Sequence, residues 1–344
     1  MNKKKINALI VFIIGILVSA FSIALVIRKV EFSKLIETAA GVSGAGFFLL
    51  TLSLILTFFT YLIRALFWNL IIRFGAGYKL SYKNSLSVLS IGLLGNNILP
   101  AKSGEIIRAV VLSKKTNLKK SFIFGSIFLE RFFDLIVLLF FLFLSSLIIK
   151  FPENIKKIEI VSFIIIGAII FFLLIFFLFY QKILSHKVFK FSKFLSKFCA
   201  WLLEKINSFK KPIVEILNLK RAVISFLLSL TIWISSTISL YLVGRTLNIQ
   251  LSLIFYFLII AVINLGAIIP SAPGAIGLYQ YLCIISLSIF GIDENVALVF
   301  SLLSHIIWYF SSSLLGVFFL FFENISLLKI LSEEKRNIDY NKGE

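Results

Sequence analysis

The sequence predicts an all-α polytopic membrane protein with six full spans and two helical hairpins, each broken by proline and glycine, arranged as an inverted internal repeat. Three observations point to this class: the 344-residue chain is 60% hydrophobic, only 15% of it is charged, and its mean hydropathy is +1.03. Soluble domains average about 45–50% apolar and about 25% charged residues, so a water-soluble globule is excluded. Because a spanning helix needs about 20 residues, this length accommodates roughly six to eight spans.

The full spans follow the long apolar runs. The first, 6–27, lies behind three lysines and is longer than the roughly 7–15 apolar residues of a cleavable signal peptide, which favours an uncleaved span. The other five are predicted at 45–73, 121–149, 160–181, 222–244 and 296–322. We expect a single transmembrane domain over 1–322, followed by a cytoplasmic tail over 323–344.

The distribution of lysine and arginine predicts the orientation. With the N-terminus in the cytoplasm and both hairpins returning to their own side, cytoplasmic segments hold 24 of the 35 basic residues and outer segments hold seven. Cytoplasmic loops are enriched in lysine and arginine, so both termini are predicted inside, at the cytoplasmic membrane of a bacterial cell. A net charge of +19 would suggest nucleic acid in a soluble protein; here it marks these loops, and no nucleic-acid partner is expected.

The loop 182–221 contains a basic amphipathic helix over 187–201, with lysines on one face and aromatic residues on the other. Such a helix would lie on the inner leaflet, with its lysines against anionic lipid headgroups. A linker helix packed on the bundle explains the same pattern equally well.

The two broken stretches are related by an offset of about half the chain. Residues 98–106, with Pro100 and Gly104, align with residues 268–276, with Pro270, Pro273 and Gly274, at an offset of 170, and Leu80-Ser81 aligns with Leu251-Ser252 at 171. The repeat copies, about 45–149 and 222–322, enter the membrane from opposite faces in the predicted topology. Inverted repeats with interrupted helices are the architecture of many transporters, whose broken helices place polar backbone at a midplane site. The alternative is that proline and glycine only kink ordinary spans.

Charged residues gather in the first copy, where each is costly unless it has a partner or water. Asn96 and Asn97 precede the first tip, and a half-helix beginning near Ser103 would direct its N-terminus at an anion. The predicted substrate-binding residues, which would hold a phospholipid headgroup, are Arg64, Asn96, Asn97, Lys102, Glu105, Arg108, Glu130, Arg131 and Asp134. The alternative is an ion-pair clamp that fixes the first hairpin against 121–149, and the two can coexist.

The second copy is uncharged at its tip. Nearby polarity comes from Asn264, Tyr279, Gln280, His305 and Tyr309. His305 lies ten residues into the last predicted span and would be able to titrate, although a lone histidine there is more often a hydrogen-bonded packing residue. The two cysteines, Cys199 and Cys283, match no metal or redox spacing, so no metal and no cofactor are expected.

Three segments, LPAKSGEIIR at 99–108, FLERFFD at 128–134 and PSAPGAIG at 270–277, resemble the lysylphosphatidylglycerol synthase transmembrane-region family. This flippase-like domain occurs alone or at the N-terminus of the multiple peptide resistance factor. The positions that match its motifs are Asn96, Leu99, Pro100, Gly104, Glu105, Arg108, Glu130, Arg131, Asp134, Pro273, Gly274 and Gly277, and Arg64 with Trp68 resembles a family pairing.

Three positions depart from the family pattern. Lys102 replaces an arginine and so loses the bidentate fork. Gln280 stands where an acid is common, and His305 stands where the last span often has arginine. An acid–arginine pair is therefore replaced here by a neutral one, which weakens the case for a coupling role of the second hairpin.

The resemblance implies handling of an anionic or aminoacylated phospholipid such as lysylphosphatidylglycerol, with a link to resistance against cationic peptides. The leading hypothesis is an ATP-independent lipid translocase, because the sequence has no phosphate-binding glycine loop. One alternative is a phosphatidylglycerol lysyltransferase with Glu105, Glu130 or Asp134 as general base. In the full-length factor, however, aminoacyl transfer belongs to a large soluble domain, and only 22 residues follow Phe322 here. The other alternative is a membrane scaffold for a separate soluble synthase.

Overall fold

In the computed structural model of the chain, the residues described are 16–27, 37–38, 40–99, 103–149, 208–216, 218–269 and 271–325. Helices are the regular structure throughout these ranges, and no strand occurs within them. The predicted span 160–181, the amphipathic helix 187–201, most of the tail, and Pro100, Lys102, Cys199 and Pro270 lie outside the described residues.

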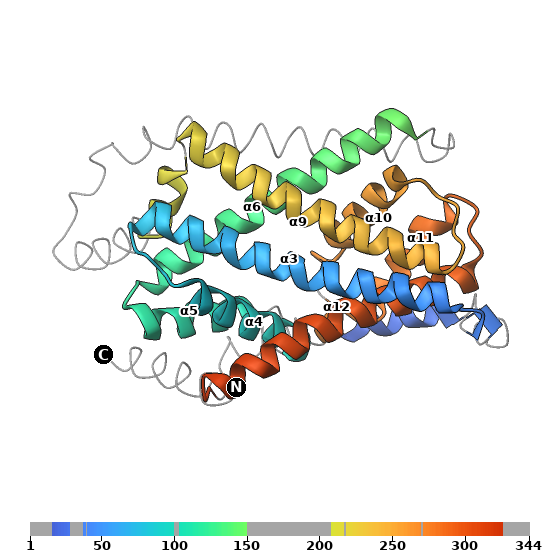
Figure 1. Cartoon of the computed structure of the whole chain (residues 1–344), viewed down its shortest axis with the longest axis horizontal. Coiled ribbons are helices and arrows are strands. Elements are labelled where there is room, and N and C mark those ends of the chain that lie inside the picture. Colours follow the sequence, from blue (N-terminus) through green and yellow to red (C-terminus); the bar gives the residue numbers. More distant parts are fainter. Residues whose placement is uncertain are drawn as a thin grey trace.

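Four long helices run along the length of the molecule: α3 (Gly44–Ala76), α6 (Lys120–Ile148), α9 (Leu219–Thr246) and α12 (Glu294–Phe322) (Figure 1). At 1.5 Å per residue, helices of 28 to 33 residues measure about 42–50 Å, more than the roughly 30 Å of a bilayer core. By length and apolar composition α3, α9 and α12 can each cross a membrane. The predicted runs 45–73, 121–149, 222–244 and 296–322 are thus confirmed as helices, with bounds that are extended or shifted by one to three residues.

Side-chain caps set where several of the helices begin. The Ser43 hydroxyl accepts from the backbone N–H of Gly46, and the Asp293 carboxylate accepts from the N–H groups of Asn295 and Val296. Such oxygens satisfy N–H groups that the first helical turn leaves without a backbone partner. The short polar residues between the apolar runs therefore fix the starts of α3 and α12.

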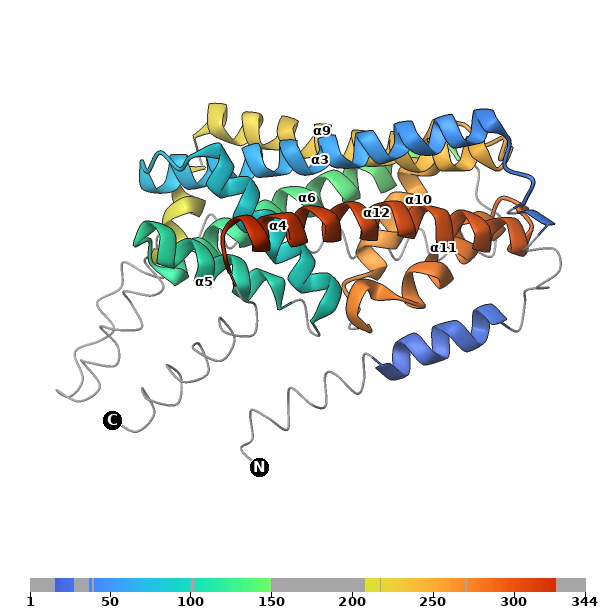
Figure 2. The same cartoon turned by 60° about the horizontal axis from the view of Figure 1, so that its bottom comes forward.

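Four further helices among the described residues are shorter than an ordinary membrane span. They are α4 (Tyr82–Ile98), α5 (Gly104–Thr116), α10 (Leu253–Gly266) and α11 (Leu278–Ser288), with 17, 13, 14 and 11 residues against the about 20 that a span needs. Helices α4 and α5 pack together in one half of the molecule, and α10 and α11 pack together in the other (Figure 2). Helix α4 ends at Ile98, directly before the Leu99-Pro100 pair of the first predicted tip.

The tips of both hairpins reach the middle of α12. At the end of α4, the Asn97 amide donates to the hydroxyls of Ser312 (2.8 Å) and Ser313 (2.9 Å). The second tip contains the short 3-10 helix η1 (Pro273–Ala275), and Gly274 there has a positive φ of 68°. A Cβ on Gly274 would lie 2.6 Å from the Tyr309 ring, so only glycine allows this tip to sit against α12.

The N-terminal helical segment Ile16–Ile27 also contacts the second tip. The Ser19 hydroxyl accepts a hydrogen bond of 2.8 Å from the backbone N–H of Ala272. Beside it Gly277 has a φ of 86°, and a Cβ there would lie 2.7 Å from the Ser19 carbonyl oxygen. This close approach explains the second glycine of the tip.

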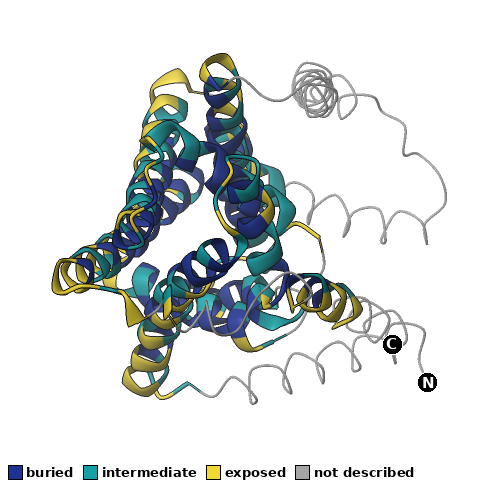
Figure 3. Cartoon of the chain, turned by 90° about the vertical axis from the view of Figure 1, so that its right-hand side faces the viewer, coloured by how far each residue is buried: buried dark blue, intermediate teal, exposed yellow. Residues whose placement is uncertain are grey.

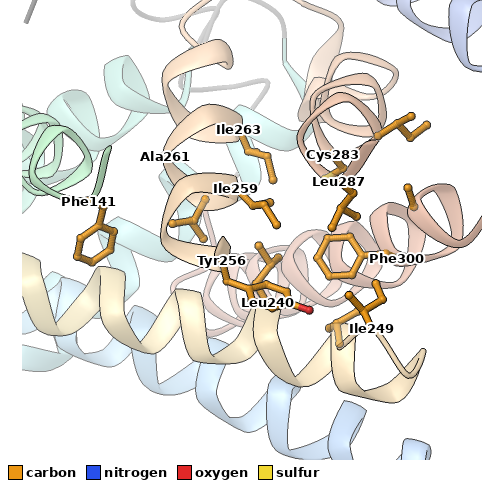
Figure 4. Packing of buried hydrophobic residues seen from close by; sticks show 14 of the residues in the cluster. Phe141, Leu240, Ile249, Tyr256, Ile259, Ala261, Ile263, Cys283, Leu287 and Phe300 are labelled. Carbon is orange, nitrogen blue, oxygen red and sulfur yellow. The ribbon is translucent and has the colours of Figure 1, made fainter. Parts of the chain in front are cut away.

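The helix contacts form matched pairs. Helix α3 packs on α9. The contact of α4 with α12 has a counterpart in the contact of α10 with α6, and the contact of α6 with α9 has a counterpart in the contact of α12 with α3. Buried residues lie on the helix faces turned toward the inside of the bundle (Figure 3), and the largest cluster among the described residues surrounds Tyr256, Cys283 and Phe300 between α9, α10, α11 and α12 (Figure 4). The outer faces carry large exposed apolar side chains such as Phe48 and Phe321, at 68% and 79% exposure. Such a surface suits lipid rather than water.

Candidate functional site

The charged residues of the first copy meet in one place, which we call the ionic cluster: Arg64 of α3, Glu105 and Arg108 of α5, and Glu130, Arg131 and Asp134 of α6. Helix α6 supplies the two buried acids, Glu130 and Asp134. Because they are four residues apart, both project from the same face of the helix. Helices α3 and α5 bring the arginines to that face.

Two arginines share the carboxylate of Glu130. Arg64 Nη1 donates to Oε1 at 3.0 Å, and Arg108 Nη2 donates to Oε2 at 2.7 Å. Charge-assisted hydrogen bonds of this length are about twice as strong as neutral ones. Glu130 is 0% exposed and therefore ties α3, α5 and α6 together inside the bundle.

Asp134 extends the cluster to α9. Its Oδ2 accepts from Arg64 Nη1 at 2.7 Å and from Arg131 Nη1 at 3.0 Å. Its Oδ1 accepts from the Trp233 indole N–H at 2.9 Å and from the Ser229 hydroxyl at 3.2 Å. Both carboxylate oxygens are thus satisfied, as a buried charge requires.

An aromatic ring and a glycine position Arg108. Its guanidinium lies 4.1 Å from the centre of the Trp68 ring, and the indole N–H of Trp68 donates to the Ser126 hydroxyl at 3.0 Å. Gly92 of α4 leaves room for the arginine stem, because a Cβ there would lie 2.3 Å from Arg108 Cγ. Arg64 and Trp68, which were expected to form a pair, thus both contribute to this site, and Trp68 stacks on Arg108.

The cluster has a sealed centre and an accessible edge. The side chains of Arg64, Arg108, Glu130 and Asp134 are 8%, 2%, 0% and 5% exposed, whereas those of Arg131 and Glu105 are 39% and 33% exposed. The centre is therefore the ion-pair clamp that the sequence left open as an alternative. Only its edge is accessible to a ligand.

The accessible edge lies deep along the helix axis. Arg131 is eleven residues beyond the start of α6, or about 17 Å along it, which is about half the thickness of a bilayer core. Arg131 Nε lies 3.4 Å from Glu105 Oε1. A positive and a negative group thus stand side by side beside the middle part of α6, each partly uncovered.

The two asparagines before the first tip have different partners. The Asn96 side-chain oxygen accepts from the backbone N–H of Gly104 at 2.9 Å and so caps α5, which begins one residue after the predicted Ser103. Asn97 turns to α12 instead and anchors the tip there. The predicted helix N-terminus is present, with Asn96 occupying its first N–H.

The polar residues of the second copy form a separate group. His305 is buried between Gln280, whose Nε2 lies 2.8 Å from Nδ1, and the carbonyl oxygen of Gly274, 2.9 Å from Nε2. Tyr279 stacks on the histidine ring at 4.5 Å and donates to Ser304 at 3.0 Å. Asn264 does not join this group, because its amide donates to the Ile260 carbonyl of its own helix.

Sequence reasoning missed three residues that contact the ionic cluster: Trp233, Ser229 and Gly92. The first two lie 99 and 95 residues from Asp134, and neither is distinctive in an apolar helix. Gly92 carries a local signal, since a glycine inside a helical run often marks a close approach of another chain segment. Nothing in the sequence indicates that Arg108 is the side chain that approaches it.

Comparison with known proteins supplies a family. Residues 12–316 match the family described as the lysylphosphatidylglycerol synthase TM region. The chain is 27% identical to the UPF0104 membrane protein MJ1595 of Methanocaldococcus jannaschii, covering 85% of this chain and 87% of the relative. It is 30% identical to the UPF0104 membrane protein MJ1078 of the same archaeon, covering 70% of this chain and 98% of that protein. A third similar protein, UPF0104 membrane protein PH1989 of Pyrococcus horikoshii, is 23% identical over 77% of this chain and 84% of its own length.

Proposed function

The chain belongs to the family of the lysylphosphatidylglycerol synthase transmembrane region, and from this membership and the ionic cluster we propose that it binds an anionic or aminoacylated phospholipid and moves it between leaflets without ATP. A phospholipid of the phosphatidylglycerol or lysylphosphatidylglycerol type fits the chemistry of the site. Its headgroup would enter at the edge of the cluster while its acyl chains stay in the bilayer.

The observation that carries this proposal is the half-exposed pair of Arg131 and Glu105. An arginine at the bilayer centre costs on the order of 2.5–3.5 kcal/mol unless it meets water or a counterion. Arg131 shares Asp134 with Arg64, and its side chain stays 39% exposed. A lipid headgroup that crosses between leaflets would carry its phosphate past this position, and a guanidinium binds phosphate well. Glu105 beside it would hold the amine of an aminoacylated headgroup.

The architecture supports a transport role. We propose that α3–α6 and α9–α12 are inverted copies and that the two hairpins are re-entrant, which leaves six full spans. Exchanging α3 with α9, α4 with α10, α5 with α11 and α6 with α12 converts each matched pair of helix contacts into its partner. At the offset of 170 that aligns the two tips, Arg108 corresponds to Leu278 and Asp134 to Ser304, each one residue before Tyr279 and His305 of the polar group. The ionic cluster and the polar group around His305 would then occupy equivalent places, both beside a broken helix.

The charges at the helix ends support the proposed orientation, with both termini in the cytoplasm. Exposed Arg73, Lys79 and Lys83 lie where α3 ends and α4 begins, and Lys115 of α5 pairs with Glu323 at the end of α12. The opposite ends of the long helices carry Arg245, Asp293 and Glu294. Cytoplasmic ends are the basic ones, so we propose a multi-pass protein of the cytoplasmic membrane whose basic face meets anionic inner-leaflet lipid.

A leaflet-resolved assay in liposomes tests the proposal. Headgroup-labelled phosphatidylglycerol or its lysyl ester should cross faster with the protein, and Arg131→Gln should slow crossing about tenfold or more, the loss expected for a charged hydrogen bond. Arg131→Lys keeps the positive charge but loses the bidentate guanidinium, so its crossing rate should lie between those of the wild type and Arg131→Gln. Arg245→Gln, on an exposed residue at the far end, is the matched control and should leave crossing unchanged.

The same preparation separates translocation from synthesis. Wild-type crossing rates in a folded Arg131→Gln variant would contradict the proposed headgroup site. Formation of lysylphosphatidylglycerol from lysyl-tRNA by the purified chain would support a lysyltransferase instead. If the chain shows neither activity but retains a soluble synthase on the membrane, it is a scaffold.

A further inference from the structure

The polar group at the second tip is a closed relay of hydrogen bonds whose donors can be assigned. The backbone N–H of Gly277 can only donate, so the Gln280 atom 2.8 Å from it is the oxygen Oε1. The NH₂ group of Gln280 therefore faces Nδ1 of His305, which must accept. The carbonyl oxygen of Gly274 can only accept, so Nε2 of His305 carries the hydrogen. The relay fits a neutral histidine in one tautomer.

Neutral groups surround this ring on every side that the structure describes. Tyr279 of α11 stacks on it, and Cys283 lies on the same helix one turn further on. Trp308 and Tyr309 of α12 lie 5.7 and 6.0 Å from the ring centre, and Tyr61 of α3 donates to the Trp308 carbonyl at 3.2 Å. No carboxylate or cation is among these described contacts, so no fixed charge compensates a proton on the ring.

We propose that His305 is a proton-binding site that controls the docking of the second hairpin tip on α12. A proton taken from water would bind the Nδ1 lone pair, where the NH₂ group of Gln280 already points, so that two donors would face each other. Rotating the Gln280 amide would turn its oxygen to the ring but would place its NH₂ group against the N–H of Gly277. Neither arrangement satisfies a protonated ring, and the relay must open.

Opening the relay of hydrogen bonds would loosen the contact between the two hairpin tips. The relay holds Gly274 and Gly277, the two ends of a turn in which Ala275 also has a positive φ of 57°. Tyr309, packed on Gly274, also donates to the Asn97 carbonyl of the first tip at 3.5 Å. Protonation would thus loosen both tips at the centre of the molecule. Coupling of this event to lipid movement rests on the proposed function, whereas the proton site itself does not.

Hydrogen exchange of the purified protein in detergent tests the site without any transport assay. Histidine side chains ordinarily titrate between roughly pH 5 and 8, and a buried ring without a compensating charge takes its proton at or below the acid end of that range. After correction for the intrinsic effect of pH, amides in 271–281 should lose protection about fivefold to tenfold from pH 8 to about pH 4.5, the effect of losing one or two neutral hydrogen bonds. Amides in 53–68 of α3 serve as the internal reference and should not change.

Two variants make the test specific. In His305→Gln the amide keeps one donor and one acceptor but cannot titrate in this range, so protection of 271–281 should be independent of pH. In Gln280→Glu a carboxylate oxygen can accept from the protonated ring, so the tip should stay protected at the acid end of the same range. A pH response of His305→Gln equal to that of the wild type, or a wild-type tip that is insensitive to pH, would overturn the proposal. If His305→Gln fails to fold, shown by fast exchange in 53–68, the Gln280→Glu comparison decides.

Discussion

Glu130 is fully buried and accepts from Arg64 and Arg108, and each of these arginines is itself less than a tenth exposed. A buried ion pair adds little net stability compared with apolar packing, but removing one partner leaves a buried charge without compensation. The cost of a substitution therefore depends on whether the side chain belongs to the sealed centre or to the edge of the cluster.

For this reason we expect Glu130→Gln to destabilise the protein by about 3–5 kcal/mol. Arg131→Gln, at the exposed edge, should cost about 1 kcal/mol or less. Thermal unfolding in detergent, followed by circular dichroism, compares the two directly. Equal melting temperatures for both variants would show that Glu130 is not the tie that the structure indicates.

Glu323 and Lys115 form an ion pair of 2.6 Å that joins the ends of α12 and α5. Partial burial, the largest influence, raises the pKa of Glu323, but the hydrogen bond from Lys115 and the positive charges of Lys115 and Lys83 outweigh it, so the pKa is lowered. A carboxylate whose pKa is lowered on folding stabilises the fold at pH values above its pKa in the unfolded chain, which is about 4.3 for glutamate. This stabilisation disappears as the pH falls through the pKa of the folded state.

The predicted effect of Lys115→Met follows from the lowered pKa of Glu323. The variant should be less stable than the wild type at pH 7 by about 0.5–1 kcal/mol, since both side chains are nearly one-fifth exposed. The difference should shrink toward pH 3, as Glu323 takes up a proton in the folded wild type as well. Melting curves at the two pH values measure it, and a deficit that persists at pH 3 would assign the effect to lost packing of the lysine stem.

At the scale of elements, the sequence predicts the helices and the broken tips well, because apolar runs and Pro-Gly interruptions are local signals. It also brings together the residues that share α6, since Glu130 and Asp134 follow helical spacing. It does not predict that Trp233 of α9 meets Asp134, or that Asn96 and Asn97 face different partners. Those contacts depend on which helices pack side by side, and periodicity within one helix carries no information on that choice.

The contact between α4 and α5 gives a prediction at this scale. A Cβ on Gly104 would lie only 1.8 Å from the Gly92 carbonyl oxygen, so the two helices cross with no space for a methyl group. Gly104→Ala should cost about 1–3 kcal/mol by overpacking and should displace the tip of the first hairpin. Gly44→Ala is the matched control, because nothing lies within 4 Å of its added Cβ. Urea or thermal unfolding that ranks the two variants equally would contradict this packing.

For the whole molecule, the two halves use different chemistry to hold similar helices. The first half joins α5 to α6 with charges, and the second joins α11 to α12 with neutral hydrogen bonds. Breaking a buried ion pair costs more than breaking a neutral hydrogen bond. The first hairpin is therefore the more firmly held of the two, and motion of the molecule should concentrate in the second.

Orientation gives the last prediction, because a two-sided architecture needs a defined inside and outside. Cysteines at exposed Lys79 and Gln250, on opposite ends of the molecule, should react differently with a membrane-impermeant maleimide in intact cells. Gln250→Cys should be labelled from outside, and Lys79→Cys only after the membrane is permeabilised. A Cys199→Ser background removes one native thiol, and the other, Cys283, is buried. Labelling of Lys79→Cys alone in intact cells would reverse the orientation, place the basic helix ends outside, and contradict the charge asymmetry from which it was inferred.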